Sequence, residues 1–188
     1  QWIVLLVGSL GFYLFSGWEN IVFIGVTALS VWLVGLRFEK LDQLEKTLKK
    51  DAADRAEKKE IKRRIKQRKW VFLLLVMVLN FGILSYIKYW NVILGFFGTG
   101  DGFLASQLLL PLGISFYTFQ SIGYIIDCYF GKYAPERNFA RFLLFVSYFP
   151  QLIQGPINRY DALAQQLYES HRFDVHNARR ALLLIGYG

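Results

Sequence analysis

The sequence predicts an all-α fold, a multi-pass bundle of transmembrane helices. Hydrophobic residues make up 54% of the 188 positions and aromatic residues 18%, more than a soluble domain of this size usually carries. These residues gather in long runs that polar stretches separate, the pattern of helices that cross a bilayer. The net charge of +8 is concentrated in one connection between two runs.

The apolar runs cover residues 1–15, 21–36, 70–87, 108–130 and 142–153, and a further run begins at Ala181. A helix needs roughly 20 residues to cross a ~30 Å hydrocarbon core, so the shorter runs must tilt little, thin the bilayer or enter it as re-entrant pieces. Run 1–15 lacks the basic start and cleavage site of a signal peptide, and we interpret it as the trimmed end of a longer span.

The connection at 37–69 holds 14 Lys or Arg against 7 Asp or Glu, so it carries +7 of the net charge. It contains no Pro or Gly and is rich in Glu, Lys, Ala and Leu, which predicts a helix. Opposite charges four residues apart support that helix, in the pairs Glu45–Lys49, Asp51–Arg55, Asp54–Lys58 and Glu60–Arg64. Basic loops are retained in the cytoplasm, so we expect 37–69 to be cytoplasmic and the following spans to alternate from there.

We consider three roles for this basic connection and favour two of them. A solvated helix or helical pair close to anionic headgroups is favoured, and a docking site for a partner is the second possibility. Nucleic acid is not an expected partner, because acids interleave with the bases and no aromatic side chain lies among them beyond Phe38.

The run at 108–130 is interrupted by Pro111 and Gly113 and carries polar residues at membrane depth. On a helix, one face would hold Gly113, Tyr117, Gln120, Tyr124, Asp127 and Gly131, at spacings of four and three. Unsatisfied polar groups are costly in hydrocarbon, so such residues face protein or a water-filled cavity. The stripe therefore predicts either a polar path through the bundle or hydrogen bonds that hold helices together.

The segment Phe-Pro-Gln-Leu-Ile-Gln-Gly-Pro at 149–156 is a second interruption. Its prolines and glycine predict that the helix ends partway across the membrane, which frees backbone groups for other bonds. A simple helix end at the membrane surface is the alternative. The candidate binding residues of this region are Gln151, Gln154, Asn158 and Arg159.

No motif of a soluble enzyme is present, and no Cys/His cluster indicates a metal. His171 and His176 are five residues apart, off a common helical face, and we interpret them as surface or interfacial residues. A single cysteine, Cys128, excludes an internal disulfide. We expect neither a bound metal nor a permanently bound cofactor.

The interrupted region resembles the membrane-bound O-acyltransferase superfamily (MBOAT). The shared features are Pro-Leu-Gly-Ile-Ser-Phe at 111–116, Tyr-x-x-Asp-x-Tyr at 124–129 and Phe-Pro-Gln-x-x-x-Gly-Pro-Ile, in that order and spacing. The bacterial branch of alginate O-acetyltransferases and the D-alanyl transfer protein of teichoic acid synthesis is the most similar. The resemblance is tight over 106–188 and covers the earlier spans only in general layout.

This resemblance implies a ring of helices around a funnel in the bacterial plasma membrane. A cytoplasmic thioester, acetyl-CoA or an acyl-carrier thioester, would donate an acyl group to a hydroxyl of an extracytoplasmic polysaccharide. Acetyl is the expected group, with D-alanyl as the alternative. An acyl-carrier protein or an extracytoplasmic acyltransferase is a further expected partner.

The family's essential histidine is expected beyond Gly188, so no catalytic residue is assigned here and the chain alone should be inactive. The organisation expected is two transmembrane helices at 1–36, the charged loop at 37–69 and a transmembrane core at 70–188. The core would supply the funnel wall and its binding surface. Two other classes of protein remain open: a transporter or channel component that uses the same polar stripe, and a non-catalytic membrane scaffold.

Overall fold

The computed structural model describes residues 1–51, 54–96, 113–151 and 159–169, together with 180, 181, 183, 184 and 186. Every regular element within these ranges is a helix, which confirms the all-α prediction. The helices are α1 (Trp2–Ser16), α2 (Trp18–Asp51), α3 (Arg55–Phe96), α4 (Ile114–Tyr129), α5 (Phe139–Ser147) and α7 (Tyr160–Tyr168).

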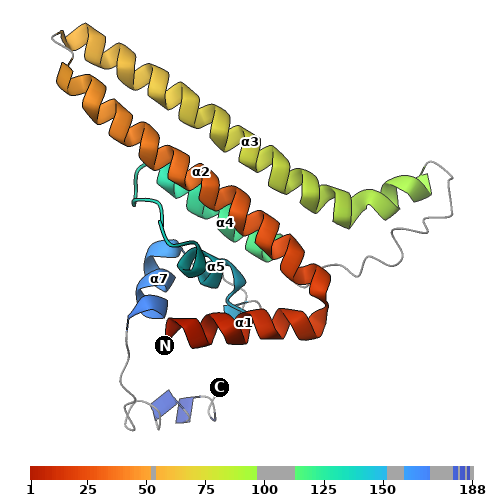
Figure 1. The fold of residues 1–188 in the computed structure, drawn as a ribbon. Helices are drawn as coiled ribbons and strands as arrows, with labels where there is room; N and C mark the ends of the chain where they lie inside the picture. Colours follow the sequence, from red (N-terminus) through yellow and green to blue (C-terminus); the bar gives the residue numbers. More distant parts are fainter. Residues whose placement is uncertain are drawn as a thin grey trace.

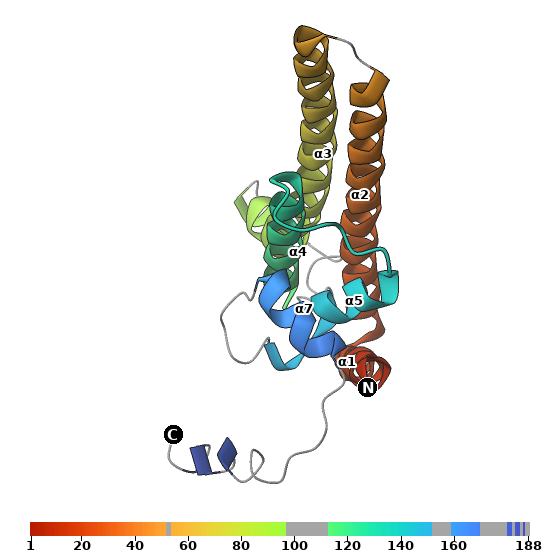
Figure 2. The ribbon, with the colours of Figure 1, turned by 90° about the vertical axis from the view of Figure 1, so that its left-hand side faces the viewer.

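The two longest helices, α2 and α3, lie side by side as an antiparallel pair (Figures 1 and 2). Each runs without interruption from an apolar half into a charged half, so the basic connection at 37–69 is the extension of two spans and not a separate element. Neither half contains a proline that would break the ladder of backbone hydrogen bonds. The predicted helicity of the connection is confirmed.

Two of the four predicted side-chain pairs form in the charged halves, and two do not. Lys49 Nζ lies 2.5 Å from Glu45 Oε1, and Arg64 Nε lies 3.0 Å from Glu60 Oε1. The predicted pair Asp51–Arg55 does not share a helix. Asp51 is the last residue of α2 and Arg55 the first of α3, because the chain turns between them. Asp54 lies just before α3 and forms no ion pair with Lys58 among the described residues.

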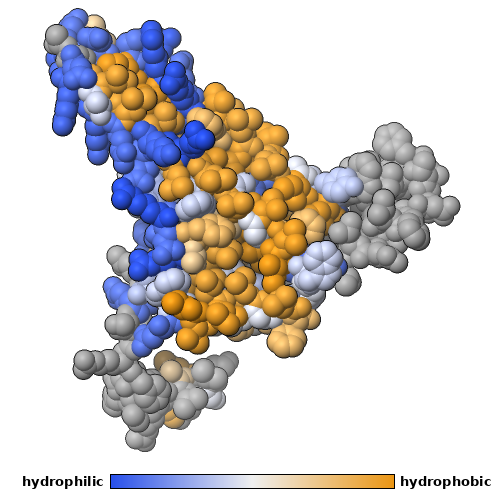
Figure 3. Space-filling view, in the orientation of Figure 1, coloured by the Kyte–Doolittle hydropathy of each residue, from blue (hydrophilic) through white to orange (hydrophobic). Residues whose placement is uncertain are grey.

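The apolar halves of α2 and α3 are long enough to cross a membrane and leave most of their apolar surface exposed. In the most apolar 18-residue stretch of each helix, 33% of the residues are buried in α2 and 22% in α3. Figure 3 shows this surface as a broad hydrophobic band below the hydrophilic ends of the hairpin. On α3, Leu75 and Val78 are 60% and 70% exposed, and a large apolar surface of this kind is typical of a protein in contact with lipid. The described chain is a membrane protein.

Between the two long helices, the packing combines aliphatic side chains with a few polar bonds. Ile24 and Val31 of α2 and Leu73 of α3 are buried in the core. Asn80, which is 1% exposed, donates from Nδ2 to Ser30 Oγ at 3.1 Å and to the Val76 carbonyl at 2.8 Å. Because an amide in an apolar interior must bond to something, this pair fixes the register of α2 against α3.

Helix α4 lies against both α2 and α3, whereas α5 packs against α1 and α2, and α7 against α5 (Figure 2). The 16 residues of α4 extend about 24 Å and the nine of α5 about 14 Å, both less than the ~30 Å core. A broken or re-entrant architecture was predicted for this half. In the structure α5 ends at Ser147, so the described part of the run at 142–153 is not one continuous spanning helix. The run beginning at Ala181 lies mostly outside the described residues.

The C-terminal end of α4 contacts α2 and α3 where their apolar halves meet their charged halves, a region that we call the hairpin base. Tyr129, the last residue of α4, has its ring 6.2 Å from that of Phe38 on α2 and 6.1 Å from that of Trp70 on α3. Arg137 donates from Nε to Glu39 Oε1 at 2.9 Å and to Oε2 at 3.1 Å. The end of α4 and the segment 130–138 therefore lie against the part of α2 and α3 where their apolar and charged halves meet.

Candidate functional site: a buried polar cluster and a basic groove

Two glycines set the limits of α4, the helix that carries the predicted polar stripe. Gly113 precedes it with φ 74°, and its carbonyl accepts the hydrogen bond of the Tyr117 N–H. Gly131 follows it with φ 76°, and the N–H groups of Gly131 and Lys132 bond to the carbonyls of Cys128 and Asp127. This pairing is a Schellman motif, which needs a left-handed residue that glycine adopts without strain. The prediction that Gly113 and Gly131 share the helical face of the stripe was wrong, because both lie outside α4 in left-handed conformations. Pro111 lies outside the described residues.

Gln120 occupies the middle of the stripe and joins α4 to the short helix α5. Its side chain is 2% exposed and donates from Nε2 to the Phe145 carbonyl at 3.1 Å and to Gln151 Oε1 at 3.2 Å. The structure thus brings together two candidate residues that lie 31 positions apart in the sequence. Gln151 is itself buried, just beyond the C-terminal end of α5.

Tyr124 lies one helical turn further along, in a packed group of rings. Its ring centroid is 4.6 Å from that of Phe142 and 4.8 Å from that of Tyr160. Its hydroxyl accepts the N–H of Glu136 at 2.7 Å, and the Glu136 carboxylate accepts the Tyr160 hydroxyl at 2.9 Å. The sequence analysis did not assign Glu136 or Tyr160, because nothing local indicates that α7 returns to this point.

Asp127 lies at the end of the stripe near the membrane surface, where it is held by neighbouring polar groups. Lys132 Nζ is 2.8 Å from its Oδ1, and the Tyr133 hydroxyl donates to Oδ2 at 3.3 Å. Burial raises the pKa of Tyr133, and Cys128 and Asp127 raise it further, so the phenol stays protonated and keeps donating. Asp127 is therefore held in a fixed orientation near the C-terminal end of α4.

Several polar atoms of α1, α4, α5 and the residues just after α5 are fully buried and have no hydrogen-bond partner among the described residues. On α4, α5 and the residue after it they are Tyr117 OH, Gln120 Oε1, Ser121 Oγ, Ser147 Oγ and Gln151 Nε2, and on α1 they are Ser9 Oγ and Tyr13 OH. We call this set the polar cluster. Helix α1 packs against α5, and α5 in turn contacts α4, which brings the three groups into one part of the fold.

The polar cluster supports both interpretations of the stripe. The hydrogen bonds of Gln120 and Tyr124 hold helices together, whereas the unpartnered atoms can form hydrogen bonds to a polar substrate or to water. Buried polar groups without partners are rare in folded proteins and mark sites where another molecule supplies the bond. Ser9, Tyr13, Ser121 and Ser147 were not predicted. The only signal for Ser9 and Tyr13 is their four-residue spacing in the apolar first helix. Ser121 and Ser147 lie on α4 and α5.

The remaining candidates are placed as follows. Arg159 is exposed and immediately precedes α7, where its carbonyl accepts the Leu163 N–H. Gln154 and Asn158 lie outside the described residues, as do His171 and His176. Among the described residues, no group of three or more His, Cys, Asp or Glu side chains converges in a way that holds a metal.

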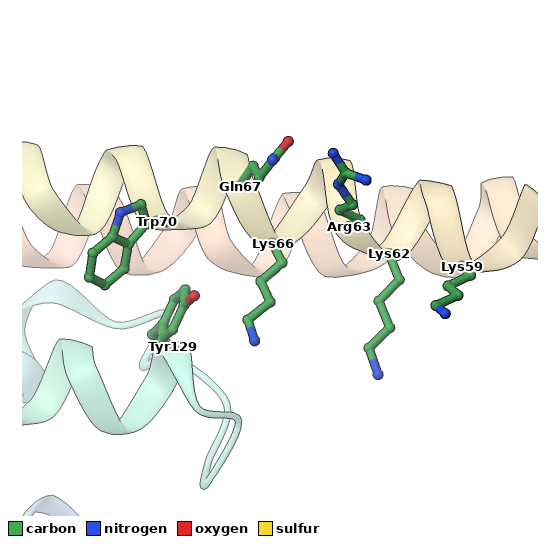
Figure 4. A pocket seen from close by; sticks show the side chains of 7 residues that line it. All are labelled: Lys59, Lys62, Arg63, Lys66, Gln67, Trp70 and Tyr129. Carbon is green, nitrogen blue, oxygen red and sulfur yellow. The ribbon is translucent and has the colours of Figure 1, made fainter.

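A second feature is a groove on the charged half of α3, which the sequence analysis did not single out. It has a volume of about 390 Å³ and is lined by Lys59, Lys62, Arg63, Lys66, Gln67, Trp70 and Tyr129. Figure 4 shows the cationic side chains along α3, with the two rings at one end where α4 approaches. We call it the basic groove.

Comparison with known proteins decides the affiliation of the chain. Over 184 residues it is 35% identical to a probable alginate O-acetylase AlgI of Pseudomonas aeruginosa, an alignment that covers 92% of this chain and 30% of that protein. A protein of the same name from Azotobacter vinelandii is 34% identical over 174 residues, 86% of this chain and 30% of its own length.

The chain is homologous to the bacterial alginate O-acetylases. A peptidoglycan O-acetyltransferase of Helicobacter pylori is also similar, 30% identical over 148 residues that cover 64% of this chain and 28% of that protein. The chain spans about 30% of the length of these O-acetylase relatives. No family model and no solved structure matches it. The resemblance that the motifs at 111–116 and 124–129 indicated is confirmed.

Proposed function

We propose that the complete protein is a membrane O-acyltransferase that moves an acetyl group from a cytoplasmic thioester to a hydroxyl of a cell-surface polysaccharide. The observation that carries this proposal is the 35% identity to an alginate O-acetylase over 92% of the chain. A relative named for peptidoglycan O-acetylation supports a polysaccharide acceptor in general, rather than one polymer.

The reaction needs a base, a donor of hydrogen bonds to the developing oxyanion, and a dry place in which both act. The acceptor hydroxyl oxygen attacks the thioester carbonyl carbon, a C–O bond forms, and the C–S bond breaks. The hydroxyl proton passes to a base and then to the departing thiolate. We propose that the base is a histidine outside these 188 residues and that this chain supplies part of the surrounding wall.

Within that wall, the polar cluster is the part we assign to binding. Gln151 Nε2 and the Tyr117 hydroxyl are donors without partners among the described residues. Donors held rigidly in an apolar interior stabilise a negative oxygen far more than donors in water do. Asp127, Gln154, Asn158 and Arg159 are proposed to line the approach to this cluster.

We propose that the chain is multi-pass in the bacterial plasma membrane with the hairpin at 37–69 in the cytoplasm. The organisation 1–36, 37–69 and 70–188 then describes two spans, a cytoplasmic extension and a core. The concentration of +7 in the hairpin supports this orientation. The level shared by the hairpin base and Tyr129 supports a return of the chain to the same side after α4.

The test is acetyl transfer by the complete protein in liposomes, supplied separately with acetyl-CoA and with an acetylated acyl-carrier protein. Ester formed on the polysaccharide is measured by its reaction with hydroxylamine. Gln120→Leu and Gln151→Leu should each lower the rate by at least about tenfold, the order expected when one oxyanion donor or its support is lost.

Asn80→Leu is the matched control, because it also removes a buried amide with two hydrogen bonds, but between α2 and α3. Its rate per folded molecule should equal that of the wild type. Wild-type rates in both glutamine variants would contradict the assignment of the cluster. If the complete protein transfers no acetyl from either donor but lets a solute cross the liposome, the transporter alternative holds.

A further inference from the structure

The basic groove presents an arrangement of charge that no described acid neutralises. Lys59, Lys62 and Lys66 recur at three- and four-residue spacings, so they share one face of α3 and are all exposed. None of them forms an ion pair with a carboxylate in the part of the chain that the structure describes, and none of the groove's lining residues is acidic. Elsewhere on the hairpin, Lys49 and Arg64 are paired.

The end of the groove nearest the apolar band is formed by two amphipathic rings. Trp70 of α3 and Tyr129 of α4 lie with ring centroids 6.1 Å apart, and Trp70 is 49% exposed (Figure 4). Tryptophan and tyrosine are the residues that prefer the headgroup level of a bilayer. The groove therefore lies where the charged half of α3 meets the membrane.

The same face of α3 continues past Trp70 as an aliphatic surface. Leu74 and Val78 follow at four-residue spacings and are 40% and 70% exposed. Along one face, α3 thus presents cations, then amphipathic rings, then alkyl groups. A phospholipid presents the matching order of phosphate, ester and glycerol region, and acyl chain.

We propose that the basic groove is a binding site for an anionic phospholipid, with the phosphate among Lys59, Lys62 and Lys66 and an acyl chain along Leu74 and Val78. Arg63 points away from Lys62 and Lys66 (Figure 4) and adds positive charge at the edge of the groove. Cations without a neighbouring acid in the lining favour a headgroup of net negative charge over a zwitterionic one. The continuation onto Leu74 and Val78 favours a lipid over a soluble phosphate, which has nothing to place there. The proposal rests on the membrane placement of α3 and not on acyl transfer.

The binding experiment uses the complete protein in neutral detergent, titrated with dioleoyl-phosphatidylglycerol and with dioleoyl-phosphatidylcholine, and bound lipid is counted by native mass spectrometry. The wild type should bind the first phosphatidylglycerol at least about tenfold more tightly than phosphatidylcholine. The double variant Lys62→Gln/Lys66→Gln should weaken phosphatidylglycerol binding about 30-fold, the effect expected for two cations at a headgroup.

The matched control is Lys46→Gln/Lys50→Gln, which removes the same charge from exposed positions on α2 outside the groove. It should change the affinity less than about threefold, within the effect of long-range charge alone. Equal losses in the two double variants would overturn the site, because diffuse attraction to the hairpin would explain them. Equal affinity of the wild type for the two lipids would also overturn it.

Two soluble competitors distinguish a lipid from a free phosphate group. Inorganic phosphate and coenzyme A are added at the concentration of the bound lipid. Retention of phosphatidylglycerol in both cases supports the proposal, whereas its displacement by either would assign the groove to a soluble phosphate compound. Circular dichroism of each variant confirms that the helices are retained, and transfer activity plays no part in any of these readings.

Discussion

The contact between Gln120 and Gln151 offers the sharpest test of how α4 is joined to α5. Gln120→Leu removes both hydrogen bonds of the Nε2 group and leaves the Phe145 carbonyl and Gln151 Oε1 without their donor. Leucine is similar in size to glutamine and apolar, so the cavity term is small and the lost bonds dominate.

The magnitude follows from the number of bonds. Interhelical hydrogen bonds in membrane proteins average about 0.6 kcal/mol, with a maximum near 1.7. Two bonds then correspond to a loss of about 1 to 3 kcal/mol in the free energy of unfolding for Gln120→Leu. Gln151→Leu removes one of them, so we expect about 0.6 to 1.7 kcal/mol from that variant.

A double-mutant cycle isolates the shared bond. Reversible unfolding of the complete protein is followed by circular dichroism for the wild type, the two single variants and the double variant. The coupling energy should be about 0.6 to 1.7 kcal/mol, because one direct bond joins the two side chains. Single-variant losses that simply add would refute the reasoning, since they would mean that Gln120 and Gln151 do not contact each other.

Three further predictions concern the ends of α4 and the hairpin base. Asp127→Ala should lower acetyl transfer while changing the free energy of unfolding by no more than about 1 kcal/mol, because its ion pair is partly exposed; wild-type transfer would remove Asp127 from the site. A hydrogen bond from Arg137 and its charge hold the pKa of Glu39 below the usual 4.5, so the contact stabilises at neutral pH and is lost as the pH falls through that lowered value. Melting temperatures of wild type and Arg137→Gln from about pH 3 to 7 should therefore converge in acid, and a constant difference would contradict this. Gly113→Ala should cost about 1 to 2 kcal/mol at φ 74°, measured by unfolding, whereas Gly123→Ala on the open side of α4 should not destabilise.

Features that depend on neighbours in the sequence were predictable. The helicity of the hairpin followed from a proline-free stretch rich in helix-forming residues. Pro111 and Gly113 indicated an interrupted run, but not that α4 begins at Ile114. The motif at 111–116, with those after it, also identified the relatives. Each of these signals is local, because helix formation, helix ends and transfer into the bilayer depend mainly on residues within a few turns.

The polar cluster could be predicted only in part. Tyr117, Gln120 and Tyr124 were visible because polar residues at helical spacing stand out in an apolar run. Ser9 and Tyr13 could not be predicted, because one pair of hydroxyl side chains on an otherwise apolar helix does not indicate which face of that helix is buried. The pairing of Asp51 with Arg55 was wrong for a similar reason, because spacing alone does not show where a long helix turns.

By itself, the sequence determined that this protein is helical and membrane-embedded, that its charge lies on one hairpin, and that it is homologous to the bacterial O-acetylases. The tertiary structure alone decided that Gln151 meets Gln120, that Glu136 and Tyr160 close around Tyr124, and that Tyr129 completes the groove on α3. Those contacts join residues from different helices. They depend on how the helices cross and how their side chains pack, which no periodicity within one segment encodes.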